Sequence, residues 1–446
     1  MRLIVWVLLI GLAGGLTGYL FTRFETDVPK ISTRTSVQWI GGEHRHEVRI
    51  SDQGTGLESV RIWLEMAGAE YDIEAARYAG GLLGGADLNV PRLIEAVIDP
   101  LALGLSDGRA TLHVEATDYS WIGNVAHESV PLMIDTRTPR IQLETGLTYV
   151  RRGGTELVVY TVDEDTQRDG VVLGDHFFPG FPHPSDPEKR VAFYAIPPDT
   201  PPDSLPSLLA ADQAGNETSV AVRIEVIERS FPEDSLGLNE DFMRAKVTEI
   251  AGKAPALTSE EAEDLLNAYL SINRDTRAEN EATIAEVCSD SSEDRIWHGP
   301  FLQLPNSSVG SRFGARRTYR FGDREVDRQV HLGYDLASTS QAPVPAANDG
   351  VVVFADELGI YGNMVILDHG LGLFSMYGHL SNLGVEKGTL VSRGDELGHT
   401  GTTGLAGGDH LHFSMLVSGV FVDPLEWFDP KWIQEHIEVK FEISGS

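Results

Sequence analysis

The amino-acid sequence predicts a mainly β chain that begins with an apolar helix and becomes helical again before its last third. Short segments of alternating apolar and polar residues, separated by Gly, Asp, Asn and Pro, fill Pro29–Ile227 and return after Ser308. An uncharged run covers Leu3–Phe21, and apolar residues recur at helical spacing within Pro232–Asp290. These patterns predict several domains along one chain.

Length, charge and cysteine content narrow the class of protein. A chain of 446 residues is too long for one hydrophobic core. The formal net charge of −32 argues against a nucleic-acid partner, because affinity for phosphates depends on Lys and Arg. The single cysteine, Cys288, excludes an intrachain disulfide. Function therefore has to be inferred from local motifs.

The N-terminal run predicts a membrane anchor over residues 1–24. Leu3–Phe21 carries no charge and is flanked by Arg2 and Arg23. As a helix it would extend about 28 Å, close to the roughly 30 Å of a bilayer core. A cleaved signal segment is the alternative, because the small residues Ala13–Gly15 resemble a cleavage site. Both interpretations export the rest of the chain.

The strands that follow contain an internal echo. The segment Ala116–Asp135 (ATDYSWIGNVAHESVPLMID) resembles Ala210–Ile227 (AADQAGNETSVAVRIEVI). Regularly spaced short strands with turn residues between them are typical of β-sandwiches. We therefore expect two tandem immunoglobulin-like β-sandwiches, over residues 29–138 and 139–230. These domains are candidates for binding an envelope protein partner.

Three features of the sandwiches have alternative interpretations. Asp118 and Asp212 occupy the same place in the two echoes, where an Asx turn is favoured over a calcium ligand. His44 and His46 form an HxH pair, which we assign to a solvated strand face because no further ligand follows at a suitable spacing. The Phe- and Pro-rich segment Asp175–Pro184 is predicted to be a loop folded over its own sandwich, because proline interrupts regular structure. A surface that contacts a partner or the C-terminal domain is the alternative.

Residues 231–295 are predicted to be a helical linker. Thr258 and Glu261 form a capping box before a run of apolar residues at helical spacing, which includes Leu265, Leu266, Tyr269 and Leu270. This Tyr and Leu stripe is expected to be a packing surface, with recognition of a partner as the alternative.

Two motifs after Ser308 contain residues that bind metals. HLGYD places His331 and Asp335 four residues apart, and HLH places His410 and His412 two residues apart. Residues i and i+2 of a strand point to one face of the sheet. Catalytic zinc takes three His or carboxylate ligands and keeps one position for water. His331, Asp335 and one histidine of the pair supply such a set.

With the motif MYGHL, which contains Tyr377 and His379, residues 306–423 resemble the lysostaphin-like, LytM-type zinc endopeptidases. The resemblance continues in order through SRFGARR at Ser311, APVPAANDGVVVFA at Ala342, YGNMVILDHG at Tyr361, VSRGDELGHTGTTG at Val391 and GGDHLHF at Gly407. It implies an antiparallel β-sheet peptidase domain over residues 296–430, followed by a C-terminal tail over 431–446.

The resemblance implies a site with one Zn²⁺ ion. The ion would be held by His331, Asp335 and His412. His379 and His410 would be the catalytic residues beside the attacking water and the scissile carbonyl, and the division of roles between them stays open.

The resemblance also implies further roles around the site. Asn363 and Tyr377 would contact substrate, and His369 would support the site from behind. Two positions depart from the family pattern: Asp409 stands where a proline is usual, and Tyr334 where an aliphatic residue is usual. Neither departure removes a ligand, although Asp409 could alter the charge of the cleft.

The function implied is zinc-dependent hydrolysis of peptide bonds in peptidoglycan stem peptides or cross-links during cell-wall remodelling. We expect a single-pass protein of the bacterial inner membrane, with most of the chain in the periplasm and D-Ala to diaminopimelate cross-links as substrate. The alternatives are a regulatory protein with a vestigial metal site and an endopeptidase directed at proteins. The upstream domains could also keep the enzyme latent by covering its groove.

Overall fold

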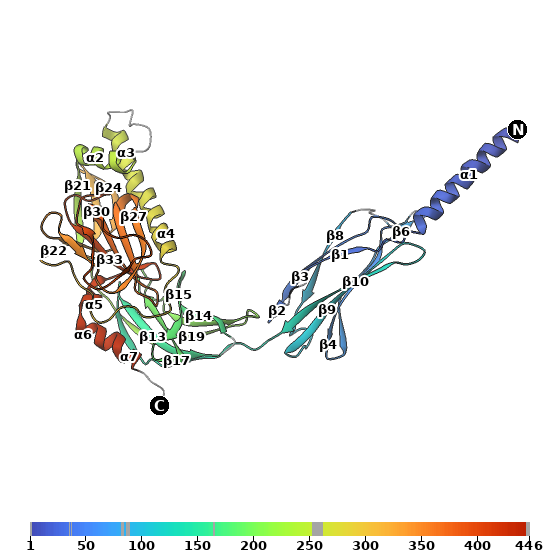
Figure 1. The fold of residues 1–446 in the computed structure, drawn as a ribbon, viewed down its shortest axis with the longest axis horizontal. Helices are drawn as coiled ribbons and strands as arrows, with labels where there is room; N and C mark the ends of the chain where they lie inside the picture. Colours follow the sequence, from blue (N-terminus) through green and yellow to red (C-terminus); the bar gives the residue numbers. More distant parts are fainter. Residues whose placement is uncertain are drawn as a thin grey trace. The chain divides into compact units, whose positions relative to one another are not determined.

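The computed structural model describes residues 2–34, 36, 38–81, 84–85, 90–163, 166–251 and 262–442. The predicted capping box at Thr258 and Glu261 lies outside these residues. The chain divides into two compact units, whose elements are labelled in Figure 1. Unit 1 consists of Met1–Pro139, Asp165–Gln167 and Ala211–Thr218, and unit 2 consists of Arg140–Glu164, Arg168–Ala210 and Ser219–Ser446.

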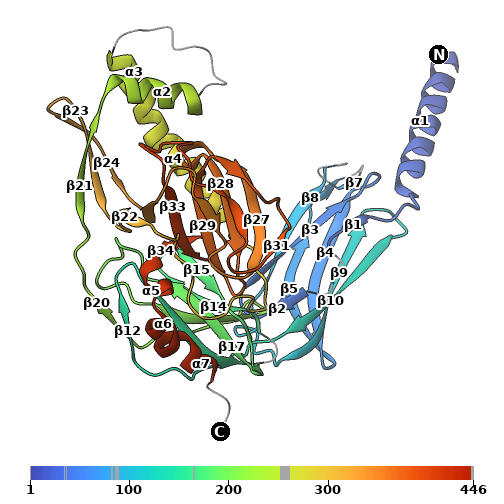
Figure 2. The same ribbon diagram turned by 60° about the vertical axis from the view of Figure 1, so that its left-hand side comes forward.

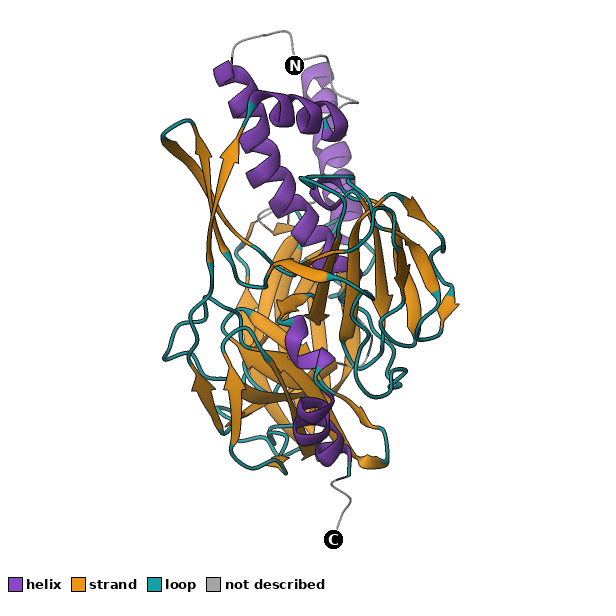
Figure 3. Cartoon of the chain, turned by 90° about the vertical axis from the view of Figure 1, so that its left-hand side faces the viewer, coloured by secondary structure: helices purple, strands orange, loops and turns teal. Residues whose placement is uncertain are grey.

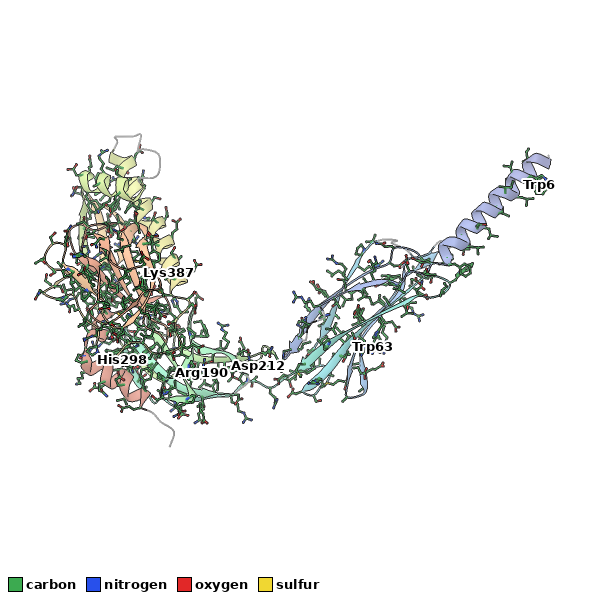
Figure 4. The ribbon with its side chains drawn as sticks, viewed as in Figure 1. Trp6, Trp63, Arg190, Asp212, His298 and Lys387 are labelled. Atoms are coloured by element: carbon green, nitrogen blue, oxygen red, sulfur yellow. The ribbon has the colours of Figure 1, made fainter. Side chains whose placement is uncertain are left out.

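Unit 1 begins with the helix that the uncharged run predicted, α1 (Arg2–Arg23). Trp6 is among the apolar side chains that project from it (Figure 4). A bilayer crossing requires about 20 mainly apolar residues in one helix. No helix within the described residues is both long enough and apolar enough to meet this requirement. The prediction of a membrane-spanning anchor is therefore not supported.

The remainder of unit 1 consists of strands around one core. One sheet has the order β1 (Lys30–Ser32), β3 (His44–Ser51), β8 (Arg92–Ile98). A second has the order β2 (Gln38–Ile40), β10 (Val125–Ile134), β9 (Gly108–Asp118), β4 (Leu57–Met66), β5 (Ala69–Arg77). The pair β6 (Gly80–Gly81) and β7 (Gly84–Gly85) forms a separate two-stranded sheet. Apolar residues of both larger sheets share the core, as the alternating pattern of β9 predicted.

The HxH pair of β3 does not lie on a solvated face. His46 is buried, and its ring nitrogens contact Thr33 Oγ1 at 2.5 Å and Gln38 Oε1 at 3.2 Å. The two histidines do share one face of the strand, as their spacing requires, but that face points inward and leaves His44 half-buried. The prediction of a solvated face was wrong because the local register, and not the polarity of the pair, determines which side is covered.

Residues 141–227 form three small sheets. The first has the order β11 (Ile141–Leu143), β13 (Thr155–Val162), β17 (Asp186–Ala195), β16 (Phe181–His183). The second has the order β15 (His176–Pro179), β14 (Thr166–Leu173), β18 (Ser207–Asp212), β19 (Glu217–Ala221). The third pairs β12 (Thr148–Arg151) with β20 (Ile224–Ile227). A mainly β chain is thus confirmed, whereas the immunoglobulin-like assignment stays a prediction.

The Phe- and Pro-rich segment forms strands where a loop was predicted. It supplies β15 and β16, and each is the outer strand of its sheet. Proline is tolerated on an edge strand because no neighbour requires its missing N–H. Phe178 and Phe181 are buried, so the aromatic residues fill the core of their own unit.

The predicted helical linker contains both strand and helix. β21 (Glu233–Leu238) precedes α2 (Glu240–Ile250), and α3 (Ala262–Ser271), the π-helical turn η1 (Ile272–Thr276) and α4 (Arg277–Val287) follow. Helices α2 and α3 lie together at one end of unit 2, and α4 runs from them towards the large sheet (Figure 2). Figure 3 shows the helices of the chain in purple and its strands in orange. Asn239 caps α2 by accepting a hydrogen bond from the N–H of Phe242 at 2.8 Å. Leu265, Leu266 and Tyr269 are buried, as expected of a packing surface.

The last third of the chain is built on one antiparallel sheet. Its order is β22 (Ser308–Ser311), β25 (Tyr334–Ala337), β33 (Leu411–Val417), β29 (Leu373–Leu380), β28 (Asn363–Asp368), β27 (Gly350–Glu357), β31 (Leu390–Val391), and β34 (Val420–Val422) pairs with β33. The neighbouring strands β33, β29, β28 and β27 are seen together in Figure 2. This sheet provides the framework of the site.

Smaller elements surround that framework. Strand β21 pairs in parallel with β23 (Arg316–Phe321), which pairs with β24 (Arg324–Val330). A second small sheet has the order β26 (Pro343–Pro345), β32 (Glu396–His399), β30 (Asn382–Leu383). The short helical segments are η2 (Gly359–Tyr361), α5 (Pro424–Phe428), α6 (Pro430–Ile433), η3 (Gln434–Glu438) and α7 (Val439–Phe441).

Candidate metal centre

Strand register brings the predicted metal ligands together. In the antiparallel pair of β25 and β33, Asp335 lies directly opposite His412. His331 comes just before β25, and its Nδ1 lies 3.0 Å from the carbonyl oxygen of Arg312. The HxxxD and HxH motifs are far apart in the chain, but strand pairing brings their side chains together.

Three side-chain atoms form the centre of the site. His331 Nε2 lies 2.9 Å from Asp335 Oδ1 and 3.1 Å from His412 Nδ1, and His412 Nδ1 lies 3.0 Å from Asp335 Oδ1. His331 and His412 are 3% and 4% exposed. Burial lowers the pKa of His412 to about 4, so its imidazole is neutral at neutral pH.

The outer hydrogen bonds determine which ring nitrogens face the centre. A carbonyl oxygen can only accept, so His331 donates from Nδ1–H to Arg312 and directs the lone pair of Nε2 inward. Ser414 donates its hydroxyl to the carbonyl of Leu332 at 2.8 Å and accepts from His412 Nε2–H at 3.1 Å. His412 therefore directs the lone pair of Nδ1 inward.

This donor set fits a metal ion. Two imidazole lone pairs and one carboxylate oxygen converge, and three acceptors at such distances repel one another unless a cation lies between them. Tetrahedral zinc with ligands at about 2.0 Å separates its ligand atoms by about 3.3 Å. The observed separations of 2.9 to 3.1 Å are close to that value.

The two other predicted catalytic histidines flank the centre. His379 donates from Nδ1 to the carbonyl of Thr403 at 2.8 Å, and His410 donates from Nδ1 to the carbonyl of Gly408 at 2.7 Å. Each ring therefore presents Nε2 to the site. The ring centroids of His379 and His410 are 4.9 Å apart. His379 lies at φ +62°, a left-handed conformation that turns its side chain away from the regular alternation of β29.

Their environments move the two pKa values in opposite directions. Burial, together with the charges of His410 and His412, holds the pKa of His379 well below its usual value. Burial also acts to lower the pKa of His410, but the hydrogen bond and charge of Asp335 outweigh it and raise this pKa. His410 Nε2 is 3.4 Å from Asp335 Oδ1. His379 is thus a neutral ring whose Nε2 carries a free lone pair, whereas His410 holds its proton more tightly.

A pocket of about 350 Å³ opens beside these residues. Its lining includes the three ligands, His379 and His410, and residues from the predicted linker. The linker contributes Leu236, Leu238, Phe242, Tyr269 and Arg277. Sequence reasoning placed the Tyr and Leu stripe in a packing surface and did not assign it to the site, because this contact joins segments that are distant in the chain.

Arg317 is a site residue that sequence reasoning missed. Its Nη2 donates to Asp335 Oδ2 at 2.6 Å, on the side of the carboxylate that faces away from the two histidines. Arg317 lies on β23 and lines the pocket. Arg317 is the last residue of the SRFGARR segment, which matched the family pattern and could therefore have indicated a role for this arginine in the site.

Helix α2 also supports the site from outside the motif region. Lys246 Nζ donates to the carbonyl of Thr402 at 2.6 Å, and Glu249 Oε1 accepts from the N–H of Gly404 at 2.7 Å. Both contacts flank Thr403, whose carbonyl orients His379. The predicted linker therefore holds the loop that positions this histidine.

Two of the remaining predicted residues lie away from the centre. Tyr377 is 1% exposed, and its Oη accepts from the N–H of Ala347 at 2.8 Å. It lies opposite Phe413, whose side chain points to the other face of β33 from His412. This position does not favour substrate contact. His369 is also buried, with Nδ1 2.7 Å from the carbonyl of Asp349. It contacts none of the three ligands directly, so it belongs to the core behind the sheet.

Asn363 and Asp409 have structural partners. Asn363 donates from Nδ2 to the carbonyl of Leu380 at 3.1 Å and is half-buried. Asp409 accepts from Thr400 Oγ1 at 2.6 Å and from the N–H of Gln341 at 3.0 Å. The carboxylate that replaces the usual proline thus braces the loop before His410.

Two buried histidines and one partly buried aspartate at a pocket, flanked by two further histidines, are the arrangement that a mononuclear centre of the metallopeptidase type uses. Comparison with known proteins gives the family: residues 329–424 form a domain of peptidase family M23. The chain therefore carries a metallo-endopeptidase domain.

Three similar proteins illustrate the family. The peptidoglycan DD-endopeptidase ShyA of Vibrio cholerae is 38% identical over 111 residues, which are 25% of each chain. The DD-carboxypeptidase/endopeptidase Mpg of Neisseria meningitidis is 37% identical over 122 residues, or 27% of each chain. The catalytic domain of lysostaphin from Staphylococcus simulans is 28% identical, with 29% of this chain and 98% of that chain covered and a TM-score of 0.26. The chain thus matches about a quarter of the length of these first two relatives.

Proposed function

We propose that this protein is a zinc-dependent endopeptidase that hydrolyses peptide bonds of peptidoglycan stem peptides or their cross-links during cell-wall remodelling. The observation that carries the proposal is the convergence of His331 Nε2, Asp335 Oδ1 and His412 Nδ1 beside a pocket. The substrate class is supported by relatives that are named peptidoglycan DD-endopeptidases. By the same likeness we infer a periplasmic site of action and a D-Ala to diaminopimelate bond.

The three ligands would hold one zinc ion. Nitrogen and oxygen donors in a set of three, already oriented by outer hydrogen bonds, are typical of catalytic zinc. When bound, zinc lowers the pKa of water towards about 7 and polarises a carbonyl group. The protein's contribution is to keep both imidazoles in the tautomer that directs a lone pair inward.

His379 and His410 divide the proton chemistry. His379 is neutral and presents Nε2 to the site, so we assign it the role of proton acceptor from the attacking water. His410 holds its proton more tightly because Asp335 lies beside it. We assign it the hydrogen bond to the oxygen on which negative charge develops.

The pocket walls suit a peptide that carries carboxylates. Arg277 and Arg317 contribute positive charge, and Leu236, Phe242 and Tyr269 contribute apolar surface. Stem peptides present free carboxylates beside small apolar side chains, which these two kinds of surface complement.

The pocket walls that the predicted linker contributes also allow a test of whether the linker keeps the enzyme latent. If the linker blocks access of substrate, Phe242→Ala should increase the rate of hydrolysis at low substrate concentration. If the linker instead helps to bind substrate, the same variant should have a higher KM.

The decisive experiment is release of soluble muropeptides from purified peptidoglycan by the full chain. Release should require zinc and should disappear in His331→Ala. The matched control is His298→Ala, because His298 is an exposed histidine outside the site (Figure 4). Fragment masses would identify the bond. Equal release by His331→Ala and the unchanged chain would refute the proposal, and cleavage of unmodified proteins without release from the wall would favour a protein-directed endopeptidase.

A further inference from the structure

A second cluster of potential metal ligands lies in unit 1. It consists of Glu25, which follows α1, Asp52, which follows β3, and Asp118, at the end of β9. One carboxylate oxygen from each lies within 4.8 Å of those of the other two. Asp52 and Asp118 are 5% and 0% exposed, and Glu25 is half-buried. Two carboxylates are thus taken out of water, and a third lies beside them partly exposed.

Backbone donors orient the three carboxylates but leave some of their oxygens free. Asp52 accepts from Gly54 and Gly56 through Oδ2, and Glu25 accepts from Thr55 through Oε2. Within the described parts of the chain, no hydrogen bond reaches Asp52 Oδ1 or Glu25 Oε1. Asp118 Oδ2 accepts from the side chain of Asn124 alone. Each of the three carboxylates therefore has an oxygen that can still bind a cation or accept a hydrogen bond.

The hydroxyl of Thr55 provides an independent observation. Thr55 is 1% exposed, and its Oγ1 makes no hydrogen bond in the part of the chain that the structure describes. The Thr55 side chain lies beside the carboxylate of Glu25 and lowers its pKa, but without the regular geometry of a hydrogen bond. An unpartnered buried hydroxyl is costly, and a hydroxyl oxygen is a suitable ligand for a hard cation.

The charges of the cluster are not balanced by a basic side chain. Burial raises the pKa of Asp52, and the neighbouring charges that raise it further are those of Asp118 and Asp27. Burial likewise raises the pKa of Glu25, with Asp52 and Asp118 adding to the effect. The charged groups that act most strongly on both pKa values are therefore carboxylates. A divalent cation would remove this repulsion.

We propose that Glu25, Asp52, Asp118 and the hydroxyl of Thr55 bind one Ca²⁺ ion. A set of oxygen ligands alone, taken from the ends of elements and from the turns beside them, suits calcium and not zinc. Bound calcium would tie the segment that leaves α1 to two loops of the β-sheet unit. The same junction carries a ring contact between Phe24 and Trp121, with centroids 5.1 Å apart.

The internal echo supplies a matched control. Asp212 makes the same kind of turn as Asp118, accepting from the N–H of Asn216 at 2.9 Å. In the described part of the chain, Asp212 belongs to no group of three potential ligands. The Asx turn predicted for both aspartates is therefore present at both, and the acidic neighbours distinguish Asp118.

The test is a Tb³⁺ titration of the full chain, with Ca²⁺ as competitor. A His331→Ala background keeps the zinc site out of the measurement, and Trp121, three residues after Asp118, serves as the sensitiser. We expect saturation at one ion per chain and displacement by calcium. Glu25→Gln, which preserves size, should weaken binding at least tenfold, whereas Asp212→Asn should bind like the unchanged chain.

Two further measurements keep the test decisive. Calcium should raise the Tm of the unchanged chain and should have a smaller effect on Glu25→Gln, with circular dichroism verifying that each variant is folded. Thr55→Val, in which the hydroxyl alone is removed, should also weaken Tb³⁺ binding. Unchanged affinity in both Glu25→Gln and Thr55→Val, or no saturable binding at millimolar calcium, would overturn the proposal.

Discussion

The molecule contains two buried clusters of possible metal ligands, and they are built in different ways. His331, Asp335 and His412 combine two neutral imidazoles with one carboxylate, whereas the cluster of Glu25, Asp52 and Asp118 contains carboxylates alone. The first is fixed by strand register, since Asp335 and His412 face each other in a ladder. The second is fixed by turns whose backbone N–H groups hold each carboxylate.

Compactness alone therefore does not determine which metal a cluster suits. Both sets satisfy the same separation limit. Borderline metals such as zinc favour imidazole nitrogen and rigid tetrahedral geometry, whereas calcium favours several oxygens in adaptable geometry. The two clusters should therefore respond independently to metals and to mutation.

The largest expected effect comes from removing a catalytic metal ligand, and it tests whether the two clusters act independently. His412→Ala should reduce muropeptide release at least about a thousandfold, because it removes a ligand from the catalytic ion. The same variant should bind Tb³⁺ at the acidic cluster with unchanged affinity. Conversely, Asp52→Asn should weaken Tb³⁺ binding and leave muropeptide release unchanged. A joint loss of both properties in either variant would contradict the independence of the clusters.

A smaller effect should distinguish the histidines around the first cluster from its ligands. His379→Ala should lower kcat by about 10²- to 10⁴-fold, the range for loss of a general acid or base, while zinc content stays at one ion per chain. Zinc content is measured by atomic absorption after dialysis. Loss of the metal along with activity would instead make His379 a ligand.

Arg317 should have an intermediate effect through the carboxylate it holds. Arg317→Ala removes the partner of Asp335 Oδ2 and should weaken zinc binding about 10- to 100-fold, as is usual for residues that orient a ligand. Competition with a chromogenic chelator measures this affinity. Arg317→Lys should restore part of it. Tighter zinc binding by Arg317→Ala would mean that charge repulsion outweighs orientation.

The smallest effect concerns a buried carboxylate that belongs to neither cluster. Burial raises the pKa of Glu426 to about 8, and its Oε2 accepts from the N–H of Thr155 at 2.9 Å. The folded state therefore binds this proton more tightly than the unfolded state. Stability from this group is present below about pH 4.5 and is lost as the pH rises towards 8.

Glu426→Gln should remove that pH dependence. Its Tm at pH 9 should exceed that of the unchanged chain by about 2–4 °C, and the difference should disappear at pH 4. Scanning calorimetry between pH 4 and 9 measures both values. Calcium should not alter the difference, because Glu426 lies in unit 2. A variant that is less stable at pH 9 would show that the charge is stabilising.

The sequence predicted the main elements of the site because its motifs are local and chemically specific. The two HxH pairs illustrate how far such reasoning extends. Spacing placed each pair on one strand face, but the partners that surround each face come from other segments. His46 meets Thr33 and Gln38, whereas His412 meets Asp335 and His331.

The remaining errors have the same origin. Three features depend on strand pairing between distant segments. They are the inward face of β3, the edge positions of β15 and β16, and the ion pair of Arg317 with Asp335. The pattern of apolar and polar residues within a segment predicts whether it is a strand or a helix, but not which strands it pairs with. The membrane anchor is a separate case, because that prediction rested on the composition of one helix. It is not supported, since no helix among the described residues meets the criterion for a span.

The contacts of α2 with the loop before His410 determine how this enzyme could be shortened. A chain that began at residue 296 would retain every residue matched to the family, yet it would lose the bonds from Lys246 and Glu249 that hold the loop around Thr403. His379 takes its orientation from that loop. The smallest portable catalyst should therefore start upstream of β21, so the family match marks where the chemistry lies and not where the protein can be cut.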